Sequence, residues 1–368
     1  MADDSRSSAS ALRLFLWSRA AIWLLALVVL LGFDGALNAR RGEWDSARLH
    51  DLGAVIDVWG RWDSDWYLRI AEHGYRWPSS TPAFFPLYPL LVAALGRILL
   101  GHFLLAGVLI SLAAGAAAFV LLHRLTALRL DASAARHTVL FLAVAPTSLF
   151  FGAVYSESLF LLLAVATFLL AERGRFWHAG AAAGLALLTR SAGVALLPAL
   201  VVFAWRSPDR RRALAGTAVA PLLFALYPAV LAIWIGRPLA FLDAQKVVWE
   251  RRLSPAGPLG GIVGALQDRE LLDLGVALGL VALGIVAWRR IGPAYGLYTL
   301  VSVAIPLTFV SDKVPLWSMQ RFAVVVFPAF MALSTVVRSR RAVTLTATIL
   351  AAGLCVYVVR WALWYWVA

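Results

Sequence analysis

Acidic and aromatic side chains alternate closely in one short segment, residues 61–75, of an otherwise apolar sequence. The segment reads Arg-Trp-Asp-Ser-Asp-Trp-Tyr-Leu-Arg-Ile-Ala-Glu-His-Gly-Tyr. Carboxylates can bind or deprotonate sugar hydroxyls, and aromatic faces can cover the apolar C–H surface of a pyranose ring. This mixture therefore favours a sugar ligand. The residues that we expect to contact the sugar are Trp62, Asp63, Asp65, Trp66 and Tyr67.

Other interpretations of Asp63 remain open. Residues 64–73 are predicted to form a helix that Gly74 ends, and Asp63 could simply cap that helix, as aspartate often does. Asp63 and Asp65 also form an Asp-x-Asp pattern, which in soluble sugar transferases holds a divalent metal. Two aspartates at this spacing often occur by chance, so we do not favour a metal or another cofactor. His73 is an alternative base, because the ordinary pKa of histidine lies near neutrality.

The composition places most of the chain in a membrane. Of its 368 residues, 62% are hydrophobic and only 14% are charged. Apolar runs of roughly 17–25 residues, the length that crosses about 30 Å of hydrocarbon as a helix, recur along the chain. Because backbone groups in lipid must be satisfied within a segment, and nothing alternates with period two, we predict an all-α polytopic bundle. The formal charge of +13 is divided among short clusters between apolar runs, which indicates topology rather than a nucleic-acid partner.

About eleven membrane crossings are predicted, and the basic clusters orient them. With the N-terminus inside, every strongly basic short loop is cytoplasmic if residues 84–100, interrupted by Pro86 and Pro89, do not cross. The first apolar run is then an uncleaved spanning helix. Residues 33–102 form a large extracytoplasmic loop within a single domain, residues 1–368. The predicted crossings are 14–32, 103–123, 137–153, 157–171, 179–190, 191–205, 213–236, 271–288, 293–311, 321–337 and 342–366.

Further short motifs follow residues 61–75 in order along the chain. They are Ala-Phe-Phe-Pro-Leu-Tyr-Pro-Leu at 83–90, Tyr-Ser-Glu-Ser-Leu-Phe at 155–160, Thr-Arg-Ser-Ala-Gly at 189–193 and Ser-Met-Gln-Arg-Phe at 318–322. Together the five segments resemble the PIG-V family, the GPI mannosyltransferase II family of GT-C glycosyltransferases. The resemblance implies a GT-C-type fold, a polyprenyl-phosphate sugar donor, transfer outside the cytoplasm, Asp63 as the acidic residue of the first loop, and chemistry without a metal.

Transfer from a lipid phosphate assigns roles to particular side chains. A general base must take the proton of the acceptor hydroxyl, and we choose Asp63, because a loop carboxylate within hydrogen-bond reach can do so. Cations must stabilise the departing phosphate. Arg190 and Arg321 are the candidates, with Lys313 behind them, because a planar guanidinium suits phosphate oxygens. An arginine at a helix end can also merely extend to the membrane interface.

Glu157 and Tyr155 lie together at another predicted outer helix end. An ionisable residue that borders hydrocarbon is a functional hypothesis by default, so Glu157 could orient a ligand hydroxyl or pair with an arginine. Both residues are included among the substrate-binding candidates. The structural alternative is that Glu157 only begins a helix, where the helix dipole favours a carboxylate.

The sequence thus predicts a bacterial inner-membrane enzyme that moves a hexose, with mannose favoured, from a polyprenyl-phosphate donor to an extracytoplasmic glycan, lipid or protein. Bacterial members of the family do not make GPI anchors, so the acceptor is not implied. Arabinose, glucose or galactose are alternative sugars. A transporter or flippase of a lipid-linked sugar is the main rival. It would place ionisable residues near the bilayer midplane, whereas eight of the twenty acidic residues here gather between residues 33 and 83.

Overall fold

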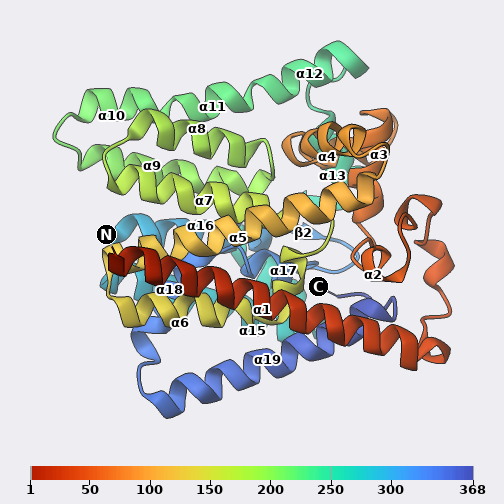
Figure 1. Ribbon diagram of the computed structural model, residues 1–368. Coiled ribbons are helices and arrows are strands. Elements are labelled where there is room, and N and C mark those ends of the chain that lie inside the picture. The colour runs from red at the N-terminus through yellow and green to blue at the C-terminus, as the bar shows by residue number, and fades with distance from the viewer. Residues whose placement is uncertain (1, 249, 368) are drawn as a thin grey trace. The chain divides into compact units, whose positions relative to one another are not determined.

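The computed structural model describes residues 2–248 and 250–367, and nearly all of its regular structure is helical (Figure 1). This confirms the predicted all-α class. In the described residues the only strands are β1 (Arg251–Leu253) and β2 (Phe309–Ser311), which pair antiparallel with Arg251 opposite Ser311. Short 3-10 turns are η1 (Asp34–Ala36), η2 (Arg41–Glu43), η3 (Ala47–Leu49), η4 (Thr81–Ala83), η5 (Pro146–Phe151) and η6 (Ser191–Ala195).

The chain divides into two compact units. Unit 1 comprises the described residues of Met1–Gly74, Leu87–Leu162 and Val337–Val367, and unit 2 comprises Tyr75–Pro86 and Leu163–Val336. The helices are α1 (Ala2–Gly32), α2 (Ala54–Asp57), α3 (Ser64–His73), α4 (Leu87–Ile98), α5 (Phe103–Arg129), α6 (Ala132–Ala143), α7 (Glu157–Glu172), α8 (Phe176–Leu187), α9 (Leu196–Trp205), α10 (Arg210–Thr217), α11 (Val219–Phe224), α12 (Leu226–Ile235), α13 (Ala240–Val248), α14 (Pro258–Gln267), α15 (Leu271–Arg290), α16 (Pro293–Thr308), α17 (Met319–Ala323), α18 (Phe327–Val336) and α19 (Arg340–Ala362).

Several of these helices are long and apolar enough to cross a membrane, and the protein is a multi-pass membrane protein. The candidate spans in the described residues are Ser8–Gly32, Phe103–Arg129, Arg210–Ile235, Leu271–Arg290 and Arg340–Ala362. Each coincides with a predicted crossing. The total of about eleven stays a prediction, because the other apolar helices are shorter than 18 residues. Helix α4 has 12 residues, a length of about 18 Å, which is too short to cross, as expected for this proline-containing stretch.

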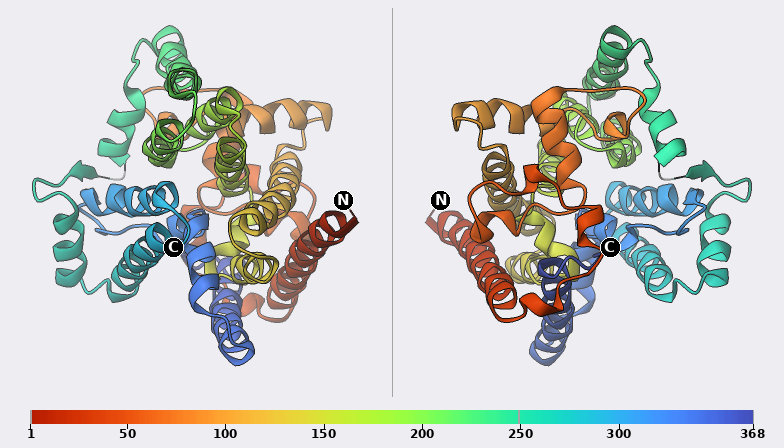
Figure 2. Two further views of the ribbon diagram at one scale, coloured as in Figure 1. Left: turned by 90° about the vertical axis from the view of Figure 1, so that its left-hand side faces the viewer. Right: turned by 90° about the vertical axis from the view of Figure 1, so that its right-hand side faces the viewer.

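In unit 1, α1 packs against α5, α6 and α19. Small residues allow the close approach: a β-carbon added at Gly115 of α5 would lie 2.7 Å from Cζ of Phe15 on α1. Such small residues are typical of helix interfaces in membranes. In unit 2, α10 and α11 follow one another in one row of Figure 1, α8 packs along them and α9 packs against α10, and these helices are seen nearly end-on in Figure 2. There Gly180 of α8 faces the carbonyl oxygen of Gly216 on α10.

The predicted crossing at 137–153 is not one continuous helix. Helix α6 ends at Ala143, and the 3-10 turn η5 begins at Pro146, because proline lacks a backbone donor and disfavours helix at the residue before it. The buried guanidinium of Arg19, on α1, donates to the carbonyl oxygens of Ala143, at 2.9 Å, and of Ser148. The interruption is therefore tolerated because a side chain supplies the missing donors.

Replacing Arg19 with methionine is expected to destabilise the fold. Two buried carbonyl groups would lose a charged donor, at a total cost of about 1–3 kcal/mol, because the Ser148 hydroxyl still donates to the carbonyl oxygen of Ala143. The apparent melting temperature of the detergent-solubilised protein measures this loss. The control is Arg13→Met, because Arg13 is exposed on the same helix and, within the described part of the chain, hydrogen-bonds only to Ala9 of that helix. Equal melting temperatures for the two variants would contradict a stabilising role of Arg19.

Candidate active site

Helix α3 begins directly after Asp63 and ends at Gly74, as predicted. Gly74 has φ +72, a backbone conformation that suits glycine at a helix end. Asp63 occupies the N-cap position, but in the described structure its side chain makes no capping hydrogen bond to the first turn. The hydroxyl of Ser64 instead accepts the backbone N–H of Arg61, at 3.1 Å. The half-buried Asp63 carboxylate is therefore not used to hold the helix end.

The backbone on both sides of Asp63 is held by Tyr155, which lies 92 residues further along the chain. The buried Tyr155 hydroxyl accepts the N–H of Asp63, at 3.1 Å, and donates to the carbonyl oxygen of Arg61, at 3.2 Å. The N–H of Val154 donates to the carbonyl oxygen of Trp59, at 3.0 Å. The structure thus brings two predicted site residues together, and the Tyr155 phenol holds the backbone on both sides of Asp63.

Buried hydroxyl groups continue from Tyr155 into the interior of unit 1. The hydroxyls of Tyr67 and Ser156 are 2.8 Å apart, and Ser111 donates to the carbonyl oxygen of Tyr155 at 3.1 Å. Glu157, the first residue of α7, follows Ser156 directly in the sequence and is completely buried. Burial of a carboxylate is costly unless polar groups surround it. Glu157 therefore remains a candidate for ligand binding, as does Tyr67.

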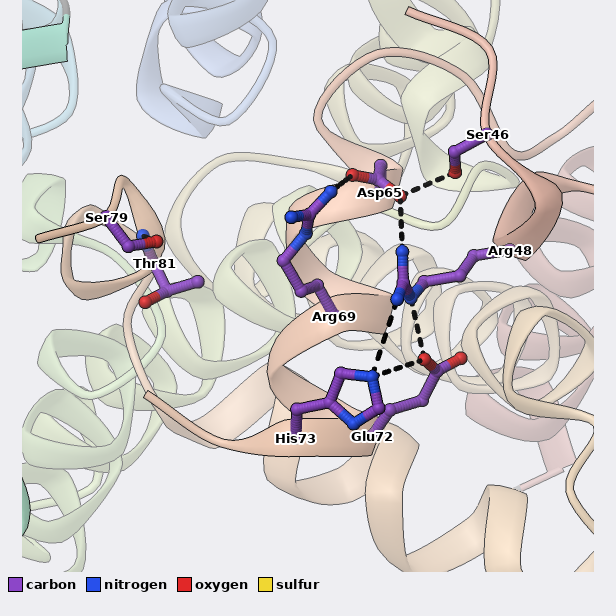
Figure 3. A network of polar contacts seen from close by, with 8 residues as sticks. All are labelled: Ser46, Arg48, Asp65, Arg69, Glu72, His73, Ser79 and Thr81. Atoms are coloured by element: carbon purple, nitrogen blue, oxygen red, sulfur yellow. Dashed lines mark hydrogen bonds and ion pairs between the residues drawn. The ribbon is translucent and has the colours of Figure 1, made fainter. Parts of the chain in front are cut away.

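Asp65, on α3, belongs to a polar network that joins α3 to the first loop (Figure 3). Its two oxygens accept hydrogen bonds from Ser46, at 2.6 Å, and from Arg69, at 2.8 Å. Arg48 lies 3.8 Å from the same carboxylate and donates to Glu72 at 2.7 Å. The network fastens the turn η3 to α3. The substrate-binding role of Asp65 stays a prediction, and this structure gives the carboxylate a second role in holding the loop.

The sequence also allowed His73 as the base, or a metal ion bound by Asp63 and Asp65. The His73 ring lies 3.6 Å from the Glu72 carboxylate and 3.4 Å from Arg48, so it belongs to the network of Figure 3. Within the described residues, no group of three or more His, Cys, Asp or Glu side chains is arranged to hold a metal ion. Asp63 stays the predicted base and His73 the alternative.

The two tryptophans of the segment have different surroundings. Trp62 is buried, with φ +53, and its ring packs edge-on against Trp364 and Trp366 at 5.8 and 5.1 Å. This backbone conformation costs about 1–3 kcal/mol for a bulky residue and persists only where its surroundings hold it. Trp66 is half-buried on α3, and the Arg69 guanidinium lies 5.1 Å from its ring. Of the two, Trp66 is better exposed to a sugar.

Three guanidinium groups converge in unit 2. Arg190, at the start of η6, Arg321, on α17, and Arg251, on β1, each place their Cζ 5.6 Å from the centre of the Phe322 ring. Cations over an aromatic ring are attracted by its electrons, whereas the three like charges repel one another. Such a cluster favours a strongly negative ligand. The exposed Lys313 ammonium pairs with Glu250, at 3.0 Å.

Sequence reasoning identified two of these arginines and missed the third. Arg190 and Arg321 lie in motifs that carry the family resemblance. Arg251 lies in a stretch without such a motif, and the only available signal was the basic pair that it forms with Arg252. The pairing of β1 with β2 puts Arg251 opposite Ser311, and its guanidinium donates to the carbonyl oxygen of Trp317 at 3.2 Å. The pairing of β1 with β2 thereby places the Arg251 side chain next to Phe322.

Nearly half of the chain matches a known protein family. The family model for the PIG-V mannosyltransferases matches residues 39–205. The predicted resemblance to PIG-V is confirmed. The matched PIG-V segment contains Asp63, Tyr155, Glu157 and Arg190, and it ends before Arg251 and Arg321.

The similarity to individual mannosyltransferases covers only part of each protein. GPI alpha-1,6-mannosyltransferase 2 of Mus musculus is 36% identical over 147 residues, which is 37% of this chain and 30% of the mouse protein. The protein of the same name from Cricetulus griseus is 35% identical over 144 residues, 36% of this chain and 29% of that protein. The matched segment thus spans less than a third of these relatives.

The fold itself is similar to that of ArnT from Cupriavidus metallidurans. The structure of ArnT bound to undecaprenyl phosphate superposes with a TM-score of 0.54 at 17% identity, covering 90% of this chain and 61% of ArnT. The apo structure of ArnT gives 0.51 at 18% identity, covering 88% and 61%. At this identity the likeness concerns the fold alone, and it confirms the predicted helical membrane bundle.

Proposed function

We propose that this protein is a glycosyltransferase that moves a hexose from a polyprenyl-phosphate carrier to an acceptor outside the cytoplasm. The names of the similar mouse and Cricetulus griseus proteins favour mannose. The undecaprenyl phosphate bound to ArnT, which shares the fold, supports the class of carrier. The acceptor is a glycan, lipid or protein. The observation that carries the proposal is the turn of Asp63, which lies in the PIG-V-like segment with its backbone fixed and its carboxylate partly exposed.

Asp63 is the proposed general base. It accepts the proton of the acceptor hydroxyl while the hydroxyl oxygen attacks the anomeric carbon. The bond between that carbon and the phosphate oxygen breaks, and its electron pair leaves with the lipid phosphate. The Tyr155 hydroxyl accepts one hydrogen bond and donates another, and the two fix the backbone at Asp63 before the acceptor arrives. The backbone that carries the base therefore loses little conformational freedom when the transition state forms, and this positioning lowers the activation barrier.

Arg190, Arg251 and Arg321 are the proposed groups that stabilise the leaving phosphate. In the donor, the phosphate is a diester with one negative charge. When the sugar departs, it becomes a monoester and its charge rises toward two. Three guanidinium groups around Phe322 therefore interact more strongly with the transition state than with the bound donor, which is the requirement for catalysis.

The experiment that tests this function follows the bond between sugar and phosphate. The purified protein is reconstituted in liposomes with polyprenyl-phosphate mannose labelled in the sugar, and a total membrane extract supplies acceptors. We expect label to move into the acceptor fraction with equal release of polyprenyl phosphate. Glucose, galactose and arabinose donors, tested in parallel, identify the sugar. Label that crosses the bilayer while still attached to the lipid phosphate would show a flippase and would overturn the proposal.

A further inference from the structure

An aromatic segment, residues 361–367, packs onto residues 58–63, the turn that carries Asp63. The segment reads Trp-Ala-Leu-Trp-Tyr-Trp-Val, and helix α19 ends inside it, at Ala362. Asn38, in the first loop, donates from its backbone to the carbonyl oxygen of Leu363, at 3.0 Å, and from its side chain to that of Trp364, at 3.1 Å. The loop and the aromatic segment are therefore fastened together, although the predicted crossing had continued through residue 366.

Trp361 and Trp364 contact this turn at two points. The indole N–H of Trp361 donates to the carbonyl oxygen of Val58, at 2.7 Å. The two residues are 303 positions apart in the sequence. The Trp361 ring also packs edge-on against Tyr155, at 5.7 Å, and Tyr155 is the residue that holds the backbone of Asp63. Trp364 lies with its ring 4.2 Å from the Arg61 guanidinium carbon. Both ends of the turn are thus in contact with the aromatic segment.

Arg61 is an unusual buried cation. It is 5% exposed, and its Nη1 donates to the carbonyl oxygens of Asp57 and Gly60, at 2.8 and 2.9 Å. Its Nε has no hydrogen-bond partner among the described residues. Burial lowers the pKa of the Arg61 guanidinium to about 10, opposed by the charges of Asp45 and Asp57, so it remains a cation at neutral pH. A desolvated cation of this kind depends strongly on an aromatic face such as that of Trp364.

We propose that the aromatic segment fixes the position of the Asp63 turn, and that Trp364 is a positioning residue that acts through Arg61. Arg61 stands two residues before Asp63, and the next ring, that of Trp62, packs against Trp364 as well. A shift of Trp364 therefore moves the backbone of the base. This inference rests on the proposed function, because it concerns the same carboxylate.

The test compares Trp364→Ala with Trp364→Phe in the liposome transfer assay. Misplacing a catalytic group by about 1 Å can lower a rate about 100-fold. We expect the alanine variant to lower kcat by about 10–100-fold while KM for the donor changes less than about threefold. Phenylalanine keeps an aromatic face and is expected to restore most of kcat. Trp17→Ala is the control, because Trp17 is 75% exposed on α1.

A second measurement separates positioning from general loss of structure. In an Asp63→Asn background the base is already gone, so Trp364→Ala is expected to cause no further fall in the residual rate. The same fold loss in both backgrounds, or an unchanged kcat in Trp364→Ala, overturns the inference. Normal turnover by Asp63→Asn overturns the proposed base itself, whereas a slow Asp63→Asn with a normal Trp364→Ala overturns only the positioning role.

Discussion

Asp63→Asn is expected to lower kcat for sugar transfer by about 10²–10⁴-fold, the usual contribution of a general base. Asparagine has nearly the same shape but accepts no proton. The backbone N–H of Asp63 and the Tyr155 hydroxyl that accepts it are unchanged by the substitution, so the turn is expected to keep its position. The measurement is the initial rate of label transfer from polyprenyl-phosphate mannose, with the melting temperature recorded on the same preparation.

Glu43→Gln is the matched control for Asp63→Asn. Glu43 is an exposed acid in the same loop, and among the described residues its only ion pair is with Arg40, at 2.8 Å. Its replacement changes the loop charge by the same amount, so a full rate in this variant shows that charge alone is not responsible. Transfer at the normal rate by Asp63→Asn, with an unchanged melting temperature, would remove Asp63 from the role of base. His73 would then be the next residue to replace.

Arg251→Gln is expected to lower kcat/KM for the donor by about 10–100-fold. A hydrogen bond to a charged group contributes about 1.5–3 kcal/mol, and the loss should be larger in the transition state, where the phosphate charge rises. Arg251 is half-buried on the short ribbon, so the substitution leaves no deeply buried gap. Initial rates over a range of donor concentrations measure the effect, and inhibition by added polyprenyl phosphate measures binding of the leaving group.

Arg252→Gln provides a close control for this substitution. Arg252 is the next residue on β1, is exposed, and pairs with Asp312 at 2.6 Å. Successive side chains of a strand point to opposite faces, so this variant removes an equal charge beside the cluster without altering the groups around Phe322. Equal losses in the two variants would indicate a general effect of charge, and the cluster would then not be the phosphate site.

Local patterns predicted those features that depend on neighbouring residues. Each candidate membrane span coincides with a predicted crossing, because the need to satisfy backbone groups in lipid acts on every segment separately. The helix at 64–73, with its end at Gly74, followed from helical spacing and a glycine stop. The 137–153 crossing was wrong in detail. The helix is interrupted before Pro146, and the donors that satisfy the interrupted backbone come from Arg19, more than a hundred residues away.

By itself, the sequence determined the membrane bundle, the family resemblance and the types of residue in the site, including Asp63 and Arg190. The tertiary structure alone decided which of them meet: Tyr155 holds the backbone of Asp63, Arg251 joins the other arginines, and Trp364 covers Arg61. Hydropathy and helix signals act over a few residues and can be read from a pattern. Contacts between distant segments depend on how whole helices pack, and no local pattern carries that information.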